Sequence, residues 1–146
     1  MSQHQRQALQ AEIVSEAKKW LGTPWRHNAQ ILGAGVDCVQ LLIAVYSEVG
    51  LIPKVDTGMY PKDWHLNRSQ PLFMLGLLRF TEPVDTPEVG DVVMFKFGRQ
   101  AAHGAIHIGQ DEIIHAWSDV RQVIVTNIKN HPLEKRIDGF YRVKGL

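Results

Sequence analysis

The stretch Gly35-Val36-Asp37-Cys38-Val39-Gln40-Leu41-Leu42 contains the only cysteine of the chain, at a point where a loop is predicted to become a helix. Residues 28–35 contain two glycines and are predicted to form that loop. Apolar residues then recur at helical spacing, which predicts a helix over residues 38–49 with Asp37 as its N-cap. A thiol at a helix N-terminus lies beside unpaired N–H groups and the positive end of the helix dipole. Cys38 is therefore a candidate nucleophile, and we expect its pKa to be lowered, to roughly 3.5–7.5 with a histidine nearby.

The composition narrows the class of protein. A chain of 146 residues can bury a core without disulfides, and a single cysteine cannot form one internally. The net charge of +1 comes from interspersed acidic and basic residues, without the clustered basic face of a nucleic-acid-binding protein. No apolar run approaches the ~18 residues of a membrane span, and the N-terminus lacks the features of a signal peptide. We therefore expect one domain over residues 1–146 that is synthesised in the cytoplasm, is not inserted in a membrane and does not bind nucleic acid.

Helices are predicted in the first half of the chain and strands in the second. Residues 5–21 place apolar side chains on one helical face, and Gly22 is positioned to end that helix. Residues 51–70 are predicted to be an irregular connection, followed by a third helix over residues 71–79. Helices followed by a run of strands are typical of an α+β fold, in which helices pack on an antiparallel sheet. Short segments rich in β-branched and aromatic residues predict strands over residues 91–97, 103–108, 112–117, 122–128 and 137–143.

Two of the seven histidines, His103 and His115, are placed to act as partners of Cys38. They bracket a predicted hairpin whose turn is Gly109-Gln110-Asp111. Side chains alternate across a strand, so a register that sets Ala105 opposite His115 puts both imidazoles on one face, whereas a shift of one residue separates them. In the favourable register, one histidine takes the thiol proton and the other holds the first in its tautomer and orientation.

The segments around these residues resemble the NlpC-type cell-wall cysteine peptidases. That family consists of papain-like enzymes that cut peptidoglycan stem peptides, typically between D-γ-glutamyl and diamino-acid residues. The resemblance therefore implies a papain-like single domain with five to six strands, acting on peptidoglycan stem peptides without a cofactor or metal. The matching segments, in the family's order and spacing, are residues 20–26 (WLGTPWR), 35–38 (GVDC), 89–95 (VGDVVMF), 103–109 (HGAIHIG) and 113–116 (IIHA).

The resemblance also assigns a role to each residue of the site. It implies that Cys38 is the nucleophile, that His103 is the general base and then the acid, and that His115 orients His103. The backbone N–H of Cys38 is expected to help bind the oxyanion of the tetrahedral intermediate. Asp37 matches a position that binds the stem peptide, although it equally fits a helix cap. Trp25 stands where the family usually has a tyrosine lining the site.

The chain departs from the family's pattern directly after the nucleophile, where Val39-Gln40 replaces the usual Ser-Gly. The missing serine hydroxyl removes a polar contact to the substrate, so Val39 is expected at the substrate site without the family's usual selection of a stem-peptide end. Residues 26–35 and 60–64 look more like those of short members encoded with bacteriophage tails or prophages. That likeness implies a role in tail assembly or cell-wall penetration, with phage tail proteins as partners and incorporation in the virion.

Four other interpretations compete with this one. In the first, Cys38 is a buried, inert thiol, since free cysteines are among the most buried residues. A papain-like scaffold that binds cell-wall peptide or a tail partner without cleaving it is favoured by the change after the nucleophile. An amidase or acyl transferase of small amides would use the same catalytic residues. A metal hydrolase would use His103, His107, His115 and Asp111, although the first two lie about 13 Å apart along a strand.

Overall fold

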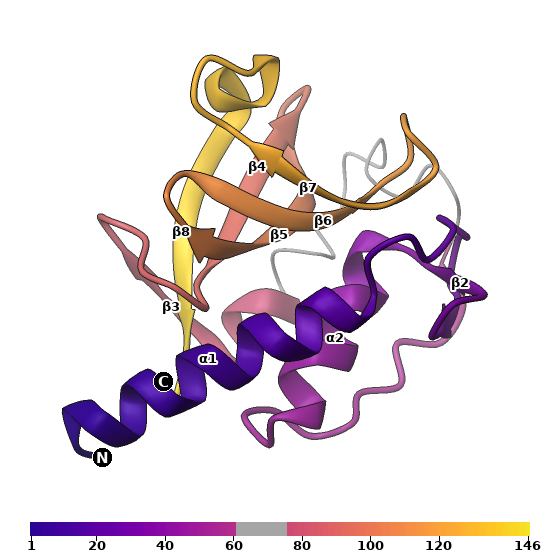
Figure 1. Ribbon diagram of the computed structural model, residues 1–146. Coiled ribbons are helices and arrows are strands. Elements are labelled where there is room, and N and C mark those ends of the chain that lie inside the picture. The colour runs from indigo at the N-terminus through magenta and orange to yellow at the C-terminus, as the bar shows by residue number, and fades with distance from the viewer. Residues whose placement is uncertain (61–75) are drawn as a thin grey trace.

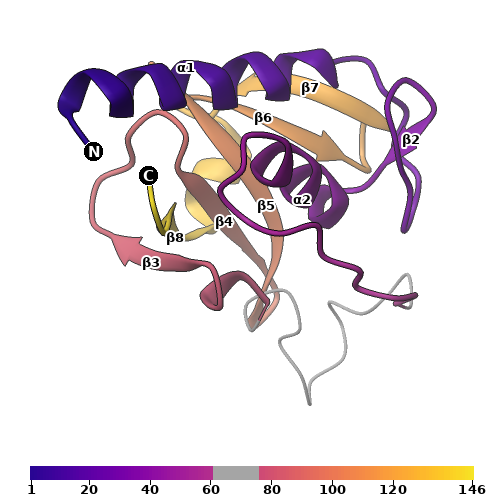
Figure 2. The ribbon, with the colours of Figure 1, turned by 90° about the horizontal axis from the view of Figure 1, so that it is seen from below.

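The computed structural model describes residues 1–60 and 76–146 and has the predicted α+β organisation. Helices α1 (Gln3–Lys19) and α2 (Cys38–Glu48) lie side by side, and α2 packs against the middle of a six-stranded antiparallel sheet (Figures 1 and 2). The order of the strands is β3-β8-β4-β5-β6-β7. They are β3 (Thr81–Val84), β4 (Val92–Phe97), β5 (Gln100–Gly109), β6 (Glu112–Trp117), β7 (Gln122–Asn127) and β8 (Ile137–Val143).

Helix α1 begins at a capping box, in which the Gln5 N–H donates to the Ser2 hydroxyl at 3.1 Å and the Ser2 N–H to the Gln5 side chain at 2.8 Å. Its core face carries Ile13 and Ala17, both fully buried. Leu21, predicted to share that face, is 41% exposed because the helix ends before it. In the described part of the chain, no helix combines the length and the apolar character needed to cross a membrane.

Helix α2 is capped by Asp37, whose Oδ1 accepts a hydrogen bond from the Gln40 N–H at 2.9 Å. This confirms the predicted cap, and the helix ends one residue before the predicted end. The preceding segment was predicted as a loop, but it contains a small hairpin of β1 (Gln30–Ile31) and β2 (Gly35–Val36). Strands of two residues are too short to show an alternating pattern, which is why the sequence did not reveal them.

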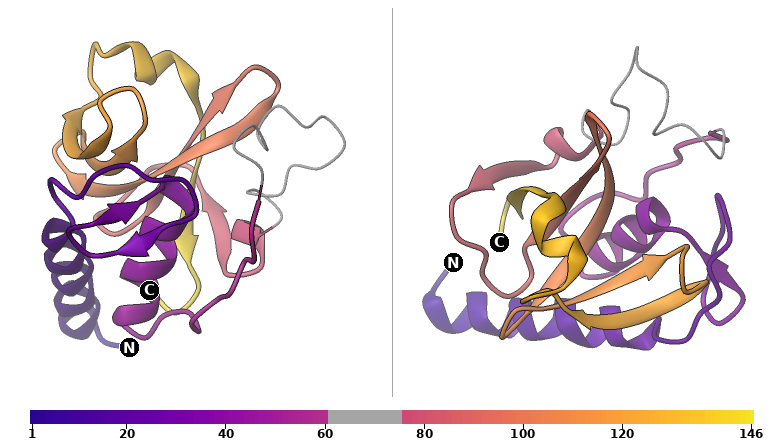
Figure 3. Two further views of the ribbon diagram at one scale, coloured as in Figure 1. Left: turned by 90° about the vertical axis from the view of Figure 1, so that its right-hand side faces the viewer. Right: turned by 90° about the horizontal axis from the view of Figure 1, so that it is seen from above.

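The segment that precedes the β1–β2 hairpin is hydrogen-bonded to β7, at the edge of the sheet, and to the turn before it. The backbone N–H of Trp25 donates to the Arg121 carbonyl at 2.8 Å, and that of Gly22 donates to the Val123 carbonyl at 3.0 Å. Figure 3 shows β1 and β2 beside the turn that joins β6 to β7, at the end of the molecule away from both termini. Trp25 is thereby held near the N-terminus of α2.

The β5–β6 hairpin has the predicted strand register but a tighter turn. Ile106 pairs with Ile114 across the two strands, as the predicted register requires. Gln110 and Asp111 both have positive φ angles, 54° and 62°, which is typical of a two-residue hairpin turn. Gly109 therefore pairs with Glu112 and the extra residue is absorbed as a bulge, so the predicted three-residue turn is wrong.

One strand of the six-stranded sheet was not predicted. β3 contains Pro83 and pairs only with β8, so it lies at the edge of the sheet, where a residue without an N–H is tolerated. Residues 76–78 are helical and agree with the end of the predicted third helix. Its remainder, residues 71–75, and residues 61–70 of the predicted irregular connection lie outside the described residues.

A buried ion pair connects the start of β4 to β8. Asp91 has no exposed surface, and its carboxylate accepts two hydrogen bonds from Arg142, at 2.9 and 3.0 Å. The same carboxylate accepts the backbone N–H of Glu88 at 2.7 Å. Arg142 also pairs with the Glu88 side chain, which in turn pairs with Arg6 of α1. These contacts give Asp91, in the matching segment 89–95, a structural role.

We expect Asp91→Ala to lower the free energy of unfolding by about 3 kcal/mol, because it leaves the backbone N–H of Glu88 unpaired and removes the buried acceptor of Arg142, which keeps only the exposed Glu88 carboxylate. Urea unfolding followed by circular dichroism measures this. Glu88→Ala is the matched control, since Glu88 contacts the same arginine from an exposed position and should change stability by about 1 kcal/mol or less. Equal losses in the two variants would contradict the assignment of the buried pair.

Candidate active site

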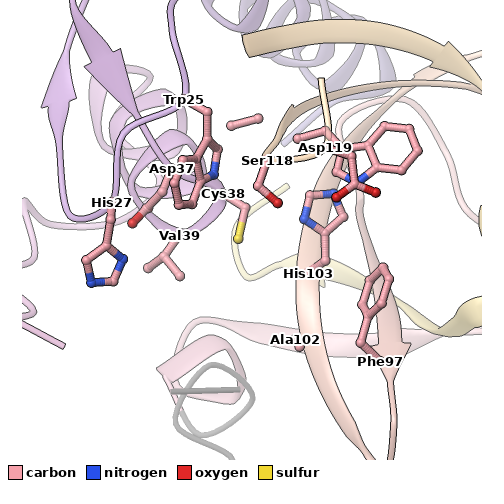
Figure 4. Close-up of a pocket in the computed structure, with 12 residues that line it drawn as sticks. Trp25, His27, Asp37, Cys38, Val39, Phe97, Ala102, His103, Ser118 and Asp119 are labelled. Atoms are coloured by element: carbon pink, nitrogen blue, oxygen red, sulfur yellow. The ribbon is translucent and has the colours of Figure 1, made fainter. Parts of the chain in front are cut away.

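A pocket of about 270 Å³ lies between the N-terminus of α2 and strands β4 to β6 (Figure 4). It brings together five of the six site residues predicted from the sequence: Cys38, His103, Trp25, Asp37 and Val39. The sixth, His115, contacts His103 from behind. The other lining residues are His27, Phe97, Ala102, Ala116, Trp117, Ser118 and Asp119.

Cys38 lies in the first turn of α2, and the residue is half-buried at the wall of the pocket. Its predicted pKa shift is wrong in direction. Burial raises the pKa of the Cys38 thiol to about 12, and the neighbouring Asp37 carboxylate adds to the rise. The backbone N–H groups of Gly104, Val39 and Cys38 itself lower it, but they do not outweigh burial. The proton therefore stays on sulfur in the free protein, and nucleophilic attack needs a base.

His103 lies where a base for the Cys38 thiol is expected. Figure 4 shows the Cys38 sulfur and the His103 ring facing each other across the pocket. Burial lowers the pKa of His103 to about 4, so its ring is neutral at pH 7 and can accept a proton. The ring contacts the rings of Phe95 and Phe97, with centroid distances of 5.7 and 6.4 Å, which restricts its rotation.

His115 is hydrogen-bonded to one ring nitrogen of His103. Its Nδ1 lies 2.7 Å from Nε2 of His103, which leaves His103 Nδ1 for the thiol. Burial, followed by the nearby His103 and His131, lowers the pKa of His115 to about 2. A neutral His115 can accept a hydrogen bond from His103, so it suits the orienting role. Trp117 stacks on the His115 ring at 5.3 Å and holds its plane.

Thr126 is a member of the site that the sequence reasoning missed. Its Oγ1 lies 2.8 Å from Nε2 of His115, on the side of the ring opposite to His103. Thr126 is in β7, opposite Ile113 of β6. The signal that could have found it is a polar residue directly after three apolar residues of a predicted strand, one strand away from the histidine.

Asp37 lines the pocket, but internal donors hold both of its carboxylate oxygens. Besides the helix cap on Oδ1, Oδ2 accepts the backbone N–H of Asn28 at 2.8 Å and the hydroxyl of Tyr60. Tyr60 is a second residue whose contact was not predicted. Its carbonyl lies 2.5 Å from Nε2 of His27. Asp37 thus joins the loop before α2 to the segment after it.

The two residues that depart from the family's pattern point to different surroundings. Val39 lines the pocket next to Cys38 and gives that wall an apolar character. Gln40 is buried and has structural contacts: its Oε1 accepts from Gln30 at 2.9 Å, and its Nε2 donates to Thr57 at 3.1 Å. Gln40 therefore ties α2 to β1 and to the segment that follows the helix.

The residues of the alternative metal site are not gathered. Within residues 1–60 and 76–146, no group of three or more His, Cys, Asp or Glu side chains is arranged to hold a metal ion. His103 and His115 face each other, whereas His107 lies near Asp91, to whose carbonyl its backbone N–H donates at 2.8 Å. The described donor set does not fit the zinc hydrolase interpretation.

Comparisons with known proteins agree with this geometry. A sequence profile of the NlpC/P60 family matches residues 22–142, which include all of the residues discussed above as catalytic candidates. No curated protein sequence matches the chain significantly.

Solved structures share the fold. The NlpC/p60 domain of the peptidoglycan hydrolase SagA aligns with a TM-score of 0.59 and 23% identity, over 90% of this chain and 96% of that chain. An NlpC/P60 family protein from Bacillus cereus aligns with a TM-score of 0.66 and 22% identity, over 92% of this chain but only 40% of its own. The peptidoglycan hydrolase RipB from Mycobacterium tuberculosis aligns with a TM-score of 0.64 and 13% identity, over 97% and 67%.

Proposed function

The chain belongs to the NlpC/P60 family, and we propose that it is a cysteine endopeptidase acting on peptidoglycan stem peptides. Two of the solved structures with a similar fold come from peptidoglycan hydrolases. The observation that carries this proposal is the hydrogen bond between His103 and His115 behind a pocket that also contains Cys38. A nucleophile, a base and an orienting group in this order are the parts of a cysteine peptidase.

The reaction begins when Nδ1 of His103 takes the proton from the Cys38 sulfur. The sulfur attacks the carbonyl carbon of the scissile amide, and the electron pair of the C=O bond moves to oxygen. This oxyanion forms next to the backbone N–H of Cys38 at the N-terminus of α2. A donor in that position typically contributes roughly 10²–10³ in rate.

The tetrahedral intermediate then collapses. The C–N bond breaks as His103 gives its proton to the leaving nitrogen, and a thioester to Cys38 remains. A water molecule, deprotonated by His103, attacks the thioester, and the proton returns to sulfur as the acid product leaves. In both halves His115 accepts the Nε2–H of the protonated His103 and stays neutral, for which its lowered pKa suits it.

The bond we propose as the target joins D-γ-glutamate to the diamino acid of the stem peptide. The support is the resemblance of the catalytic segments to enzymes with that preference. Trp25, Asp37 and Val39 line the Cys38 side of the pocket in Figure 4, so we assign them to the acyl side of the bond. With the Asp37 oxygens already held by internal donors, contacts there come mainly from the indole and the valine.

A digest of purified peptidoglycan analysed by mass spectrometry tests the proposal. We expect fragments with a new C-terminal D-γ-glutamate and a new N-terminal diamino acid, absent from a heat-inactivated sample. Cleavage at another bond would contradict the assigned target. Cosedimentation with peptidoglycan without any cleavage would favour the binding scaffold, and turnover of small amides alone would favour an amidase or acyl transferase.

A place in a phage tail stays a prediction. It is supported by the likeness of residues 26–35 and 60–64 to short phage-encoded members, and residues 61–64 lie outside the described residues. If the prediction is correct, mass spectrometry of purified particles from the source strain should detect the chain together with the tail proteins. Particles that lack it would exclude both the virion location and these partners.

A further inference from the structure

We propose that Thr126 is a positioning residue: its hydroxyl accepts the Nε2–H of His115 and so stabilises the proton arrangement that leaves Nδ1 of His103 free to act as base. This inference rests on the proposed function, because it concerns the same catalytic pair. The observation behind it is a continuous series of hydrogen bonds in the order Thr126, His115, His103, with lengths of 2.8 and 2.7 Å.

The series is shielded from water. His115 has no exposed surface, His103 is 7% exposed and Thr126 is 8% exposed. Pairing of β6 with β7 sets Thr126 opposite Ile113 and Ile124 opposite His115, so the threonine reaches the histidine diagonally across the two strands. Because the His115 ring is fully buried, solvent cannot replace the threonine hydroxyl if it is removed.

Two proton arrangements satisfy these bonds. In the first, His103 carries its proton on Nε2 and donates to Nδ1 of His115, which carries its own proton on Nε2 and donates to Thr126. In the second, Thr126 donates to Nε2 of His115, which donates from Nδ1 to Nε2 of His103, so that the His103 proton must sit on Nδ1. A neutral imidazole has one donor and one acceptor nitrogen, so the three groups change together.

Only the first arrangement supports catalysis. It leaves a lone pair on His103 Nδ1, where the Cys38 proton must go, whereas the second places a proton there. After proton transfer, both nitrogens of His103 carry hydrogen, so His115 must accept at Nδ1 and donate at Nε2. Thr126 Oγ1 is the acceptor for that donor, and without it a buried N–H is left unpaired.

The test compares Thr126→Val, which keeps the shape but removes the hydroxyl, with Thr126→Ser, which keeps the hydroxyl. We expect the valine variant to lose roughly ten- to hundredfold in kcat for stem-peptide cleavage with KM unchanged, as for an unpaired buried donor. The serine variant should stay within about threefold of the original protein, in line with a retained hydrogen bond. Nitrogen-15 NMR of the imidazoles should show His103 Nδ1 unprotonated in the original protein and in Thr126→Ser, and increasingly protonated in Thr126→Val.

Three results would overturn the proposal: full kcat in the valine variant, equal losses in the valine and serine variants, or a protonated His103 Nδ1 in the original protein. If Thr126→Val does not fold, the NMR measurement on the original protein and the activity of Thr126→Ser still test the proposal. The NMR spectra need no substrate, so they report on Thr126 even if the protein does not cleave peptidoglycan. Failure of the proposed function and failure of this inference are thereby distinguished.

Discussion

Replacement of Cys38 by alanine is expected to abolish the release of stem-peptide fragments, with kcat/KM falling by on the order of 10⁴-fold or more. Alanine has no group that can form the thioester, so only substrate binding and oxyanion contacts remain. The helix should persist, because Asp37 and its cap on the Gln40 N–H are unchanged. Fragment release is measured by quantitative mass spectrometry of peptidoglycan digests over time.

Ser47→Ala is a suitable control for this variant. Ser47 lies on the same helix, away from the pocket, and its hydroxyl contacts only the Ala44 carbonyl among the bonds of the described chain. Both variants should have the circular dichroism spectrum and thermal midpoint of the original protein, while only the cysteine variant loses activity. If Cys38→Ala released fragments at the rate of the original protein, the thiol mechanism would be excluded.

The second large effect is a loss of stability in acid. His103 and His115 are buried as neutral rings, with pKa values lowered to about 4 and about 2, whereas an unfolded histidine has a pKa of about 6.5. The unfolded chain therefore binds more protons as the pH falls. Stability from these groups is complete above about pH 6.5 and decreases below it by about 1.4 kcal/mol per pH unit for each histidine. His103 contributes down to about pH 4 and His115 down to about pH 2.

By pH 4 the combined loss is comparable with the whole stability of a typical small domain, about 5–15 kcal/mol. Urea unfolding at pH 7, 6, 5 and 4 measures the slope. The double variant with His103→Gln and His115→Gln removes both titrating groups, so its stability should depend much less on pH over the same range. A slope in the double variant equal to that of the original protein would show that other groups are responsible.

Much of the fold was predictable because its signals are local. The helix over residues 38–48 follows from an apolar repeat and an aspartate at its cap, and the strands from β4 to β8 follow from short β-branched segments between turns. The β3 strand was missed because Pro83 reads as a break, and only its position at the edge of the sheet allows it. That residues 1–146 form a single domain stays a prediction.

The candidate site was predictable in its members but not in its electrostatics. The family resemblance and the strand register together indicated Cys38, His103 and His115, and the structure brings them together, although their catalytic roles remain to be measured. The sign of the Cys38 pKa shift was wrong because the sequence shows the helix N-terminus but not the degree of burial. Desolvation of a charged group depends on atoms from many segments.

The sequence by itself located Cys38 at a helix start and the strands that carry the two histidines, and its resemblance to a known family indicated a papain-like fold. The first two features depend on periodicity, capping and segment order, which neighbouring residues set. Only the tertiary structure decided that Tyr60 and Asn28 hold the Asp37 carboxylate and that Thr126 meets His115. Those contacts join residues far apart along the chain, and their geometry exists only once the helices and the sheet have packed.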